Sequence, residues 1–433
     1  MQELNAVPKD SIRKLLLARR IEAHEQGGYL EMVFQVPEGT ERIEVFCTVQ
    51  PAGAGDSVID LGVRDGERVR GWSGGARREF FIGLNRATPG YRAGSIPPGE
   101  WAVILGTHRV APEGCAVQLD VRLHLAQPRW LCGDLHLHTE HSDGVFTLEE
   151  TVRLARNAGL DYIALTDHNT SSQNSMPEWA DGLLIVPGME LTTGRGHCNL
   201  YGVSDPLRDF RAVHADQLTE RLAEARAAGA YISLNHPHDP DCGWHWGYDA
   251  DHDWVEIWNG PWREANALTL SWWQEQLSAG RRLTAVSGSD THRPHPYVRH
   301  GWPVAWVLAE GGSVRHILEA VNQGRVTLSY APEGPFAELS CGDVPMGGEW
   351  RAALQGGPPL LRLCMKRLLA GDEVVLWSDK GREYSFIAEK DGGLNLEQEM
   401  PGRAFWRAEI WRPMISGDSR RLLAAATNPV YFE

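Results

Sequence analysis

The middle part of the chain alternates between strand-like and helix-like segments, and this alternation limits the fold more than any other feature. Seven short apolar runs between residues 131 and 332 have the pattern of strands, and helix-like stretches separate several of them. One such stretch begins with a Thr147-x-x-Glu150 capping box and ends near Gly159, as a helix does. Alternation of this kind predicts an α/β fold with a mostly parallel sheet and right-handed crossovers, either open or closed as a barrel.

The regions on either side lack this alternation. From about residue 25 to 130, short runs such as "CAVQLDVRLHLA" alternate apolar and polar residues between turns, which predicts an antiparallel β-sandwich. The region after residue 332 again contains only strand and turn patterns, which predict a small C-terminal β domain. We therefore expect three domains, at residues 1–130, 131–332 and 333–433.

Charge and cysteine content exclude several classes of protein. The net charge of −15 over 433 residues disfavours non-specific binding to nucleic acid, so we expect no nucleic-acid partner. The seven cysteines are scattered, odd in number and form no CxxC pair, which indicates reduced thiols and a cytoplasmic location. We find no signal-peptide core and no apolar run long enough to span a membrane, so we expect no membrane partner. A homo-oligomer stays open.

Histidines and carboxylates follow almost every predicted strand of the middle region. In the first strand His136 and His138 lie two residues apart, so both side chains point to one face. A single histidine in such a place is usually solvated or hydrogen-bonded, as we expect of His141, but strand ends in a parallel barrel meet on one rim. The complete set is His136, His138, Asp143, Asp167, His168, Glu190, His197, His236, Asp290 and His292.

Five short motifs that contain these residues resemble those of the PHP (polymerase and histidinol phosphatase) superfamily. In chain order they are "HLHTEHSDG", "TDHN", "GME", "NHP" and "GSDTH", and the resemblance covers about residues 131–330. The flanking stretches "IDLGVRDGERVRGWSGG" and "ATPGYRAGSIPPGEW" resemble the carbaryl-hydrolase-like branch, which has a β domain before the barrel. The resemblance implies a distorted (β/α)7 barrel, in agreement with the seven predicted strands.

The resemblance also implies a metal centre with two to three divalent ions, which the ligand types allow to be Zn, Mn or Fe. It implies catalytic roles for Glu190, Asp290, His292 and Arg293, and an orienting role for Asp167. The implied ligands are His136, His138, Glu190 and Asp290 for the first ion, Asp143, His168 and the bridging Glu190 for the second, and His197, His236 and His292 for the third.

Such a centre predicts a metal-dependent hydrolase that attacks a small-molecule substrate with a metal-bridged hydroxide. Phosphoester hydrolysis is the leading interpretation, and hydrolysis of a carbamate or an amide is the alternative within enzymes. A third interpretation is a catalytically inactive binding or scaffold protein. Retention of all nine ligand positions argues against this last interpretation, because a degenerate site loses ligands.

Side chains beside the ligand motifs suggest how a substrate could be recognised. Arginines favour a phosphate through paired hydrogen bonds, although each one alone is as compatible with an exposed surface position. Trp244 and Trp246 favour an aryl substrate if they line the site, and otherwise they are packing residues. The basic candidates are Arg195, Arg293, Arg299 and His300.

Overall fold

The computed structural model describes residues 11–75, 77–355, 358–413 and 420–433, and it divides the chain into two compact units. Residues up to 128, together with 310–313, form the first unit, and residues 129–309 and 314–433 form the second. The helices that the structure describes all lack the combination of length and apolar character that a membrane crossing requires.

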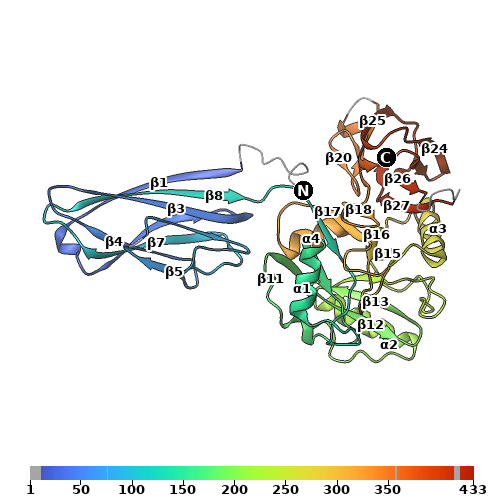
Figure 1. Cartoon of the computed structure of the whole chain (residues 1–433), viewed down its shortest axis with the longest axis horizontal. Coiled ribbons are helices and arrows are strands. Elements are labelled where there is room, and N and C mark those ends of the chain that lie inside the picture. Colours follow the sequence, from blue (N-terminus) through green and yellow to red (C-terminus); the bar gives the residue numbers. More distant parts are fainter. Residues whose placement is uncertain (1–10, 76, 356–357, 414–419) are drawn as a thin grey trace. The chain divides into compact units, whose positions relative to one another are not determined.

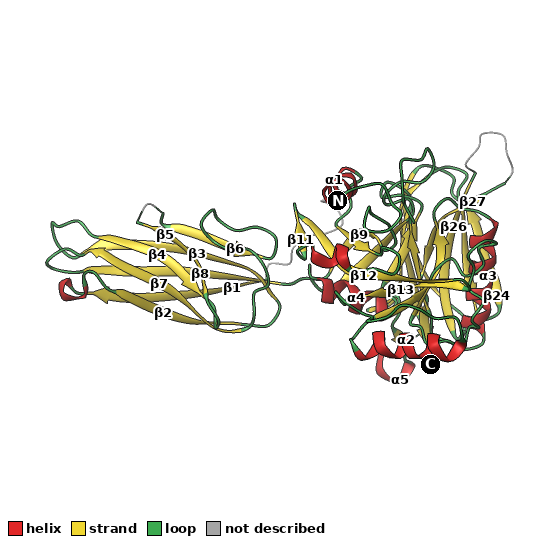
Figure 2. Cartoon of the chain, turned by 90° about the horizontal axis from the view of Figure 1, so that it is seen from below, coloured by secondary structure: helices red, strands yellow, loops and turns green. Residues whose placement is uncertain are grey.

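The first unit is a sandwich of two four-stranded antiparallel sheets (Figure 2). Alternate residues of strands from both sheets, such as Val45, Val103 and Val121, are fully buried in a common core, as the alternating sequence pattern predicts. One sheet has the order β1 (Ile12–Ile21), β8 (Cys115–Leu125), β3 (Thr40–Pro51) and β6 (Glu79–Gly83); the other has β2 (Tyr29–Val36), β7 (Gly99–Arg109), β4 (Val58–Arg64) and β5 (Val69–Gly74).

The second unit is built on one long mixed sheet (Figure 1). Each of the seven strands predicted for the middle region corresponds to a strand of this sheet. Those seven are β9 (Arg129–Asp134), β10 (Tyr162–Leu165), β12 (Leu183–Thr193), β13 (Gly196–Tyr201), β14 (Tyr231–Leu234), β15 (Trp254–Asn259) and β16 (Thr284–Gly288). The sheet continues from β9 through β17 (Val304–Ala309), β18 (Val326–Ser329), β27 (Leu422–Thr427), β26 (Phe405–Arg412), β23 (Glu373–Ser378) and β24 (Gly381–Ile387).

The shorter strands complete the unit. β11 (Trp179–Ala180) pairs with β12, and β21 (Glu349–Trp350) and β28 (Val430–Phe432) join the sheet at β26. A separate four-stranded sheet has the order β20 (Val344–Pro345), β19 (Phe336–Cys341), β22 (Leu360–Leu368) and β25 (Gly392–Glu399). Because β27 pairs with β18, strands from both sides of residue 332 share one sheet. The division of the chain into three domains stays a prediction.

The expected (β/α)7 barrel is not confirmed, because helices are few (Figure 2) and two of the pairs formed among the seven strands, β12–β13 and β13–β14, run antiparallel. β12 and β13 are joined by a turn at residues 193–196, far shorter than the dozen residues that a parallel crossover needs. The described helices of the unit are α1 (Leu148–Asn157), α2 (Ala215–Ala227), α3 (Glu264–Ser278), α4 (Val314–Asn322) and the single turn α5 (Ala352–Gln355). The capping box predicted at Thr147 does begin α1.

The first and last of the seven strands nevertheless meet beyond their carboxyl ends. An isolated parallel bridge joins Leu137 to Thr291, and the backbone N–H of His138 donates to the Thr291 carbonyl at 3.0 Å. The N–H of Asp290 likewise donates to the carbonyl of His136 at 2.8 Å. The two segments with the most predicted ligands therefore lie side by side.

Candidate metal centre

The alternation of the first strand points two histidines into a common polar cluster. Leu135 and Leu137 are buried in the core, and His136 and His138 between and after them are 1% and 0% exposed on the other face. Their two Nε2 atoms lie 3.2 Å apart. Little water reaches these two buried imidazoles. A positive charge placed beside them, on a ring or on a bound cation, therefore requires a nearby negative group.

Glu190 supplies that charge from the centre of the cluster. Its side chain is 1% exposed, and its two oxygens face different imidazoles. Burial alone would raise the pKa of a carboxyl group, but His136 and the other imidazoles hold the pKa of Glu190 well below its ordinary value. Oε1 lies 3.3 Å from His136 Nε2, 3.4 Å from His197 Nδ1 and 3.6 Å from His236 Nε2, and Oε2 lies 3.4 Å from His138 Nε2 and 2.7 Å from His168 Nδ1.

Asp290 approaches the first pair of histidines from the segment that follows β16. Its Oδ1 lies 3.1 Å from His138 Nε2 and 3.4 Å from His136 Nε2. Burial disfavours the charge of His136, yet the carboxylates of Glu256, Asp290 and Glu190 outweigh burial and raise its pKa well above the ordinary value. The backbone φ of Asp290 is 53°, which is a strained value for a residue with a side chain and is frequent at functional sites.

Asp143 gathers a second set of imidazoles at the more exposed edge of the cluster. Its Oδ1 lies 3.3 Å from His292 Nε2 and 3.6 Å from His168 Nε2. These three residues and His138 each offer a ligand atom within 4.8 Å of the others. The structure therefore brings His292 to Asp143 rather than to His197 and His236, with which the family resemblance groups it.

His197 and His236 instead lie beside Cys242, which the sequence reasoning missed. Ligand atoms of these three residues lie within 4.8 Å of one another, and Cys242 Sγ is 3.5 Å from His236 Nδ1. The thiol also donates to Asp239 Oδ1 at 3.3 Å, and Asp239 pairs with Arg263 at 2.9 Å. No sequence signal marks Cys242, because it follows the NHP motif in an irregular loop and belongs to no recognisable ligand spacing.

Two further buried groups that the sequence reasoning missed orient the predicted ligands. Glu256 on β15 is 3.0 Å from His136 Nδ1 through Oε1, and its Oε2 accepts from the backbone N–H of His236 at 3.0 Å. Asn235 donates to Glu190 Oε1 at 2.7 Å. Groups that hold the second nitrogen of an imidazole fix which nitrogen faces a metal.

Asp167, for which we predicted an orienting role, contacts the loop that contains Asp143. Its carboxylate accepts from the backbone N–H of Thr139 at 2.8 Å, from the Thr139 hydroxyl at 2.9 Å and from the Ser142 hydroxyl at 2.7 Å. His141 lies at the outer side of the same loop, where its Nδ1 is 2.7 Å from Ser172 Oγ.

The predicted substrate-binding residues are dispersed. Arg293 is exposed, and its guanidinium donates to the Asp143 carbonyl at 3.4 Å. Arg195 stacks over Trp246 at 4.5 Å and donates to the His245 carbonyl. Trp244 is only 3% exposed and belongs to the core, which agrees with the packing alternative. Arg299 and His300 line a separate cavity.

The cluster has the features of a metal centre in its donor set and in its unsatisfied atoms. Within the described residues, Glu190 Oε2 and His197 Nδ1 are buried and face imidazole and carboxylate atoms of the cluster, but neither makes a hydrogen bond of acceptable geometry. Buried polar atoms without partners are rare in folded proteins because each costs about 1–3 kcal/mol. Imidazole and carboxylate donors suit Zn, Mn or Fe, so divalent cations fit these residues.

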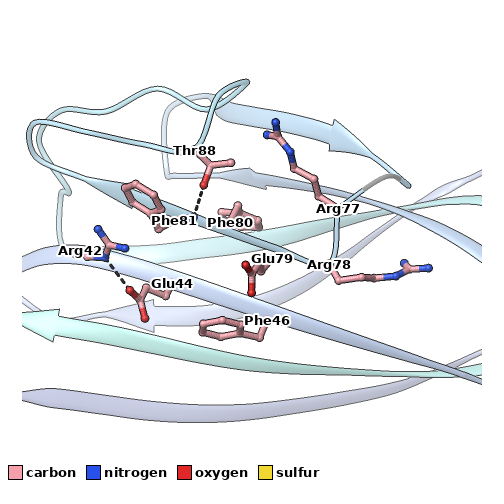
Figure 3. A pocket seen from close by; sticks show the side chains of 9 residues that line it. All are labelled: Arg42, Glu44, Phe46, Arg77, Arg78, Glu79, Phe80, Phe81 and Thr88. Atoms are coloured by element: carbon pink, nitrogen blue, oxygen red, sulfur yellow. Dashed lines mark hydrogen bonds and ion pairs between the residues drawn. The ribbon is translucent and has the colours of Figure 1, made fainter.

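A cavity of about 640 Å³ lies on the first unit, and Figure 3 shows the side chains that line it. These side chains are less suited to catalysis than those of the histidine and carboxylate cluster. Arg42 covers the ring of Phe81 at 3.8 Å, and Arg122 covers that of Phe46 at 4.5 Å. Arg42 also pairs with Glu44 at 2.8 Å. These aromatic faces and charges are therefore partnered within the protein, and the described residues that line the cavity include no histidine.

Comparison with known proteins agrees with the strand-end motifs. Residues 134–236 match the PHP domain family. A 5'-3' exoribonuclease of Salmonella typhimurium is 28% identical over 117 residues, which are 23% of this chain and 40% of the exoribonuclease. An uncharacterised protein of Methanocaldococcus jannaschii is 25% identical over 142 residues, which are 29% of this chain and 80% of that protein.

Among solved structures, one similar chain is a two-domain protein from Bacteroides vulgatus that contains a predicted PHP-like metal-dependent phosphoesterase. The match has 18% sequence identity and a TM-score of 0.41, and it covers 69% of this chain and 95% of the other. The resemblance of the flanking stretches to the carbaryl-hydrolase-like branch is not confirmed.

Proposed function

Because the chain carries a PHP domain, we propose that it is a metal-dependent hydrolase and that its substrates are small phosphoesters. The observation that carries this proposal is the position of Glu190, whose two buried oxygens face five imidazoles between them. A carboxylate with this arrangement is suited to bridge two cations. A purely structural carboxylate needs only one cationic partner.

The residues divide into those that hold cations and those that hold the ligands in place. His136, His138 and Asp290 with Glu190 would hold the first cation, and Asp143, His168 and His292 would hold another. His197 and His236 would complete a third set with Glu190. These residues would hold two to three divalent ions, which would supply Lewis acidity and lower the pKa of bound water to near neutrality.

Recognition of a phosphoester requires positive charge near the cluster. Arg293 follows His292 directly and contacts the loop of Asp143, and Arg195 precedes His197 by two residues. Guanidinium groups bind phosphate oxygens through paired charge-assisted hydrogen bonds, so these two side chains are the proposed phosphate contacts. Hydrolysis would then form a P–O bond to the oxygen of one water molecule, break the P–O bond to the leaving oxygen and transfer a proton of that water to the leaving oxygen.

Hydrolysis of a carbamate or an amide is the second candidate, since the same Lewis acidity polarises a carbonyl group. A carbamate or an amide is neutral, so its recognition does not require arginines at the site. An inactive binding or scaffold protein is the third, and the convergence of all nine predicted ligands in one cluster argues against it.

A direct test is to assay the full chain with Zn, Mn or Fe against four substrates. These are p-nitrophenyl phosphate, bis-p-nitrophenyl phosphate, an aryl carbamate and a 5'-phosphorylated RNA oligonucleotide, the last because one relative is an exoribonuclease. We expect metal-dependent cleavage of at least one phosphoester. Faster cleavage of the carbamate than of any phosphoester would favour a carbamate or amide hydrolase. Inactivity on all four substrates with every metal would favour an inactive binding or scaffold protein.

A further inference from the structure

A second cavity lies between helix α1 and the segment that follows β16, with a volume of about 550 Å³. We call it the His300 pocket and define it by Phe146, Leu154, Arg293, Arg299, His300 and Trp302. None of the nine predicted metal ligands lines it. Thr291 and Arg293, the two chain neighbours of His292, both do. The pocket is thus separate from the metal centre but adjacent to it along the chain.

His300 is a buried polar side chain that lacks a partner. The residue is 5% exposed, its ring packs edge-on against Phe146 at 5.3 Å, and its Nε2 has no hydrogen-bond partner within the described parts of the chain. Burial lowers the pKa of His300 to about 4, so the imidazole is neutral near pH 7. A buried nitrogen in this state is costly unless a ligand or water meets it.

The two arginines of the pocket also lack acidic partners. Arg293 and Arg299 are exposed, and no ion pair joins either of them to a carboxylate among the residues that the structure describes. Arg299 lies over the ring of Trp302 at 5.0 Å, which holds its guanidinium at the pocket. Glu333 lines the pocket as well and is exposed, and the structure pairs it with neither arginine.

The remaining wall is apolar. Phe146 and Leu154 contribute from the side of α1, and Val298 and Trp302 from the opposite segment. A pocket of this volume that combines an apolar wall with a few converging polar groups is typical of small-molecule sites. Two of the lining groups are cationic arginines and a third is the unpartnered Nε2 of His300, against the single carboxylate of Glu333, so the described lining favours an anion.

We propose that the His300 pocket binds a small organic anion with an aromatic body, at a site separate from the metal centre. The anionic oxygens lie against the guanidinium group of Arg299, and one of them accepts from the Nε2–H of His300. The aromatic body packs against Phe146, Leu154 and Trp302. This binding does not depend on the proposed hydrolase activity.

Benzenesulfonate is a suitable probe because it has a permanent charge, an aromatic ring and no ester to hydrolyse. Isothermal titration calorimetry on the full chain as purified should show saturable binding at one site. Methanesulfonate, which lacks the ring, and benzyl alcohol, which lacks the charge, should each bind at least tenfold more weakly. Repeating the titration after chelation of metals should leave the affinity for benzenesulfonate unchanged.

Two substitutions locate the site. Arg299→Gln and His300→Phe should each weaken binding of benzenesulfonate by roughly tenfold, because each removes one charge-assisted or buried hydrogen bond. Arg208→Gln, at another exposed arginine, should bind like the wild type. His300→Phe keeps an aromatic ring against Phe146, and a thermal melt verifies that it folds; Arg299→Gln changes only an exposed side chain.

Three results would overturn the proposal. They are the absence of saturable binding to the wild type, binding that Arg299→Gln leaves unchanged, and binding that disappears when metals are chelated. The last result would assign the anion to the metal centre. A protein that binds benzenesulfonate but hydrolyses none of the assayed substrates would retain the His300 pocket and lose the proposed function.

Discussion

Two buried carboxylates of the same unit, Glu190 and Glu409, have opposite kinds of surroundings. Glu409 pairs with Arg407 at 2.6 Å, and its other oxygen accepts from the indole N–H groups of Trp377 and Trp411 at 2.9 and 2.7 Å. Arg407 in turn donates to Gln274 at 2.7 Å. Both oxygens of Glu409 therefore have hydrogen-bond donors, and the charges of Arg407 and Glu409 cancel.

Glu190 is equally buried but is surrounded by more imidazoles than one carboxylate can satisfy. Within the described chain, Glu190 Oε2 and His197 Nδ1 make no hydrogen bond of acceptable geometry. A second carboxylate, Asp290, also lies against His136 and His138. The comparison teaches that burial of charge alone does not mark a functional site. The mark is a surplus of ligand atoms, since a self-sufficient pair such as that of Glu409 leaves nothing for an ion to bind.

The largest effect that we expect from this difference is on metal binding and turnover. Glu190→Gln removes the charge that faces all five imidazoles, so bound metal should fall and the rate of hydrolysis should drop by roughly 10³-fold, about 4 kcal/mol in the barrier. Elemental analysis and steady-state kinetics on the best phosphoester measure both.

Glu256→Gln is the control for this substitution, because it removes the same charge one contact further out, at His136 Nδ1. Loss of a group that orients a ligand typically costs roughly 10- to 100-fold, so Glu256→Gln should fall between Glu190→Gln and the wild type. Near-normal turnover in Glu190→Gln would contradict the bridging role.

Substitution at the other carboxylate should affect folding instead. Glu409→Gln leaves the buried guanidinium of Arg407 without a counter-charge, so the free energy of unfolding should fall by about 3–5 kcal/mol, while bound metal per folded chain stays unchanged. Urea unfolding measures the loss. The double variant Arg407→Met/Glu409→Gln removes both charges and should recover much of it; a single variant as stable as the wild type would contradict the structural role.

The sequence could predict that the candidate ligands lie close together, because they stand at or near the ends of apolar strands and strand ends converge in space. His136, Glu190 and Asp290 are examples, and the structure brings all nine candidates into one cluster. That they bind metal stays a prediction. The seven predicted strands are present for the same reason, since period and turn signals are local, but β11, β17 and β18 of the same region were not predicted.

The pairing of strands and the contacts of loop residues were not predictable in the same way. β12 and β13 form an antiparallel hairpin through a tight turn at residues 193–196. The resemblance to a family of barrel proteins led us to expect a parallel barrel instead. Cys242 reaches His236 only through the path of an irregular loop, and Glu256 looks like any polar residue within a strand. Trp244 was ambiguous because an aromatic side chain serves a core as well as a pocket.

A smaller effect is expected at Cys242, which contacts the second nitrogen of a proposed ligand. Cys242→Ala removes the contact between Sγ and His236 Nδ1, so the affinity for metal should fall by roughly 10- to 100-fold. Competition with a chromophoric chelator measures the affinity. Cys364→Ala, at another half-buried cysteine on β22, should match the wild type; equal affinity in all three proteins would show that Cys242 has no positioning role.

The smallest expected effect concerns a buried imidazole that, unlike those around Glu190, has partners on both nitrogens. His252 Nδ1 donates to the Ala250 carbonyl at 2.6 Å, and Nε2 accepts from Arg281 at 2.8 Å. Burial, with the nearby charge of Arg281, lowers the pKa of His252 to about 4. The folded protein therefore keeps this imidazole neutral at pH values where the unfolded chain protonates it.

Because the unfolded chain binds the extra proton, the contribution of His252 to stability is complete above about pH 6.5 and is lost as the pH falls toward 4. Between pH 7 and pH 5.5 the free energy of unfolding of the wild type should fall by about 1 kcal/mol more than that of His252→Gln. Urea unfolding at both pH values measures the difference, with His295→Gln as a control at an exposed histidine. If His252→Gln and the wild type lose stability equally, the folded protein does not hold His252 neutral. The contrast between this self-sufficient imidazole and the imidazoles around Glu190 would then be contradicted.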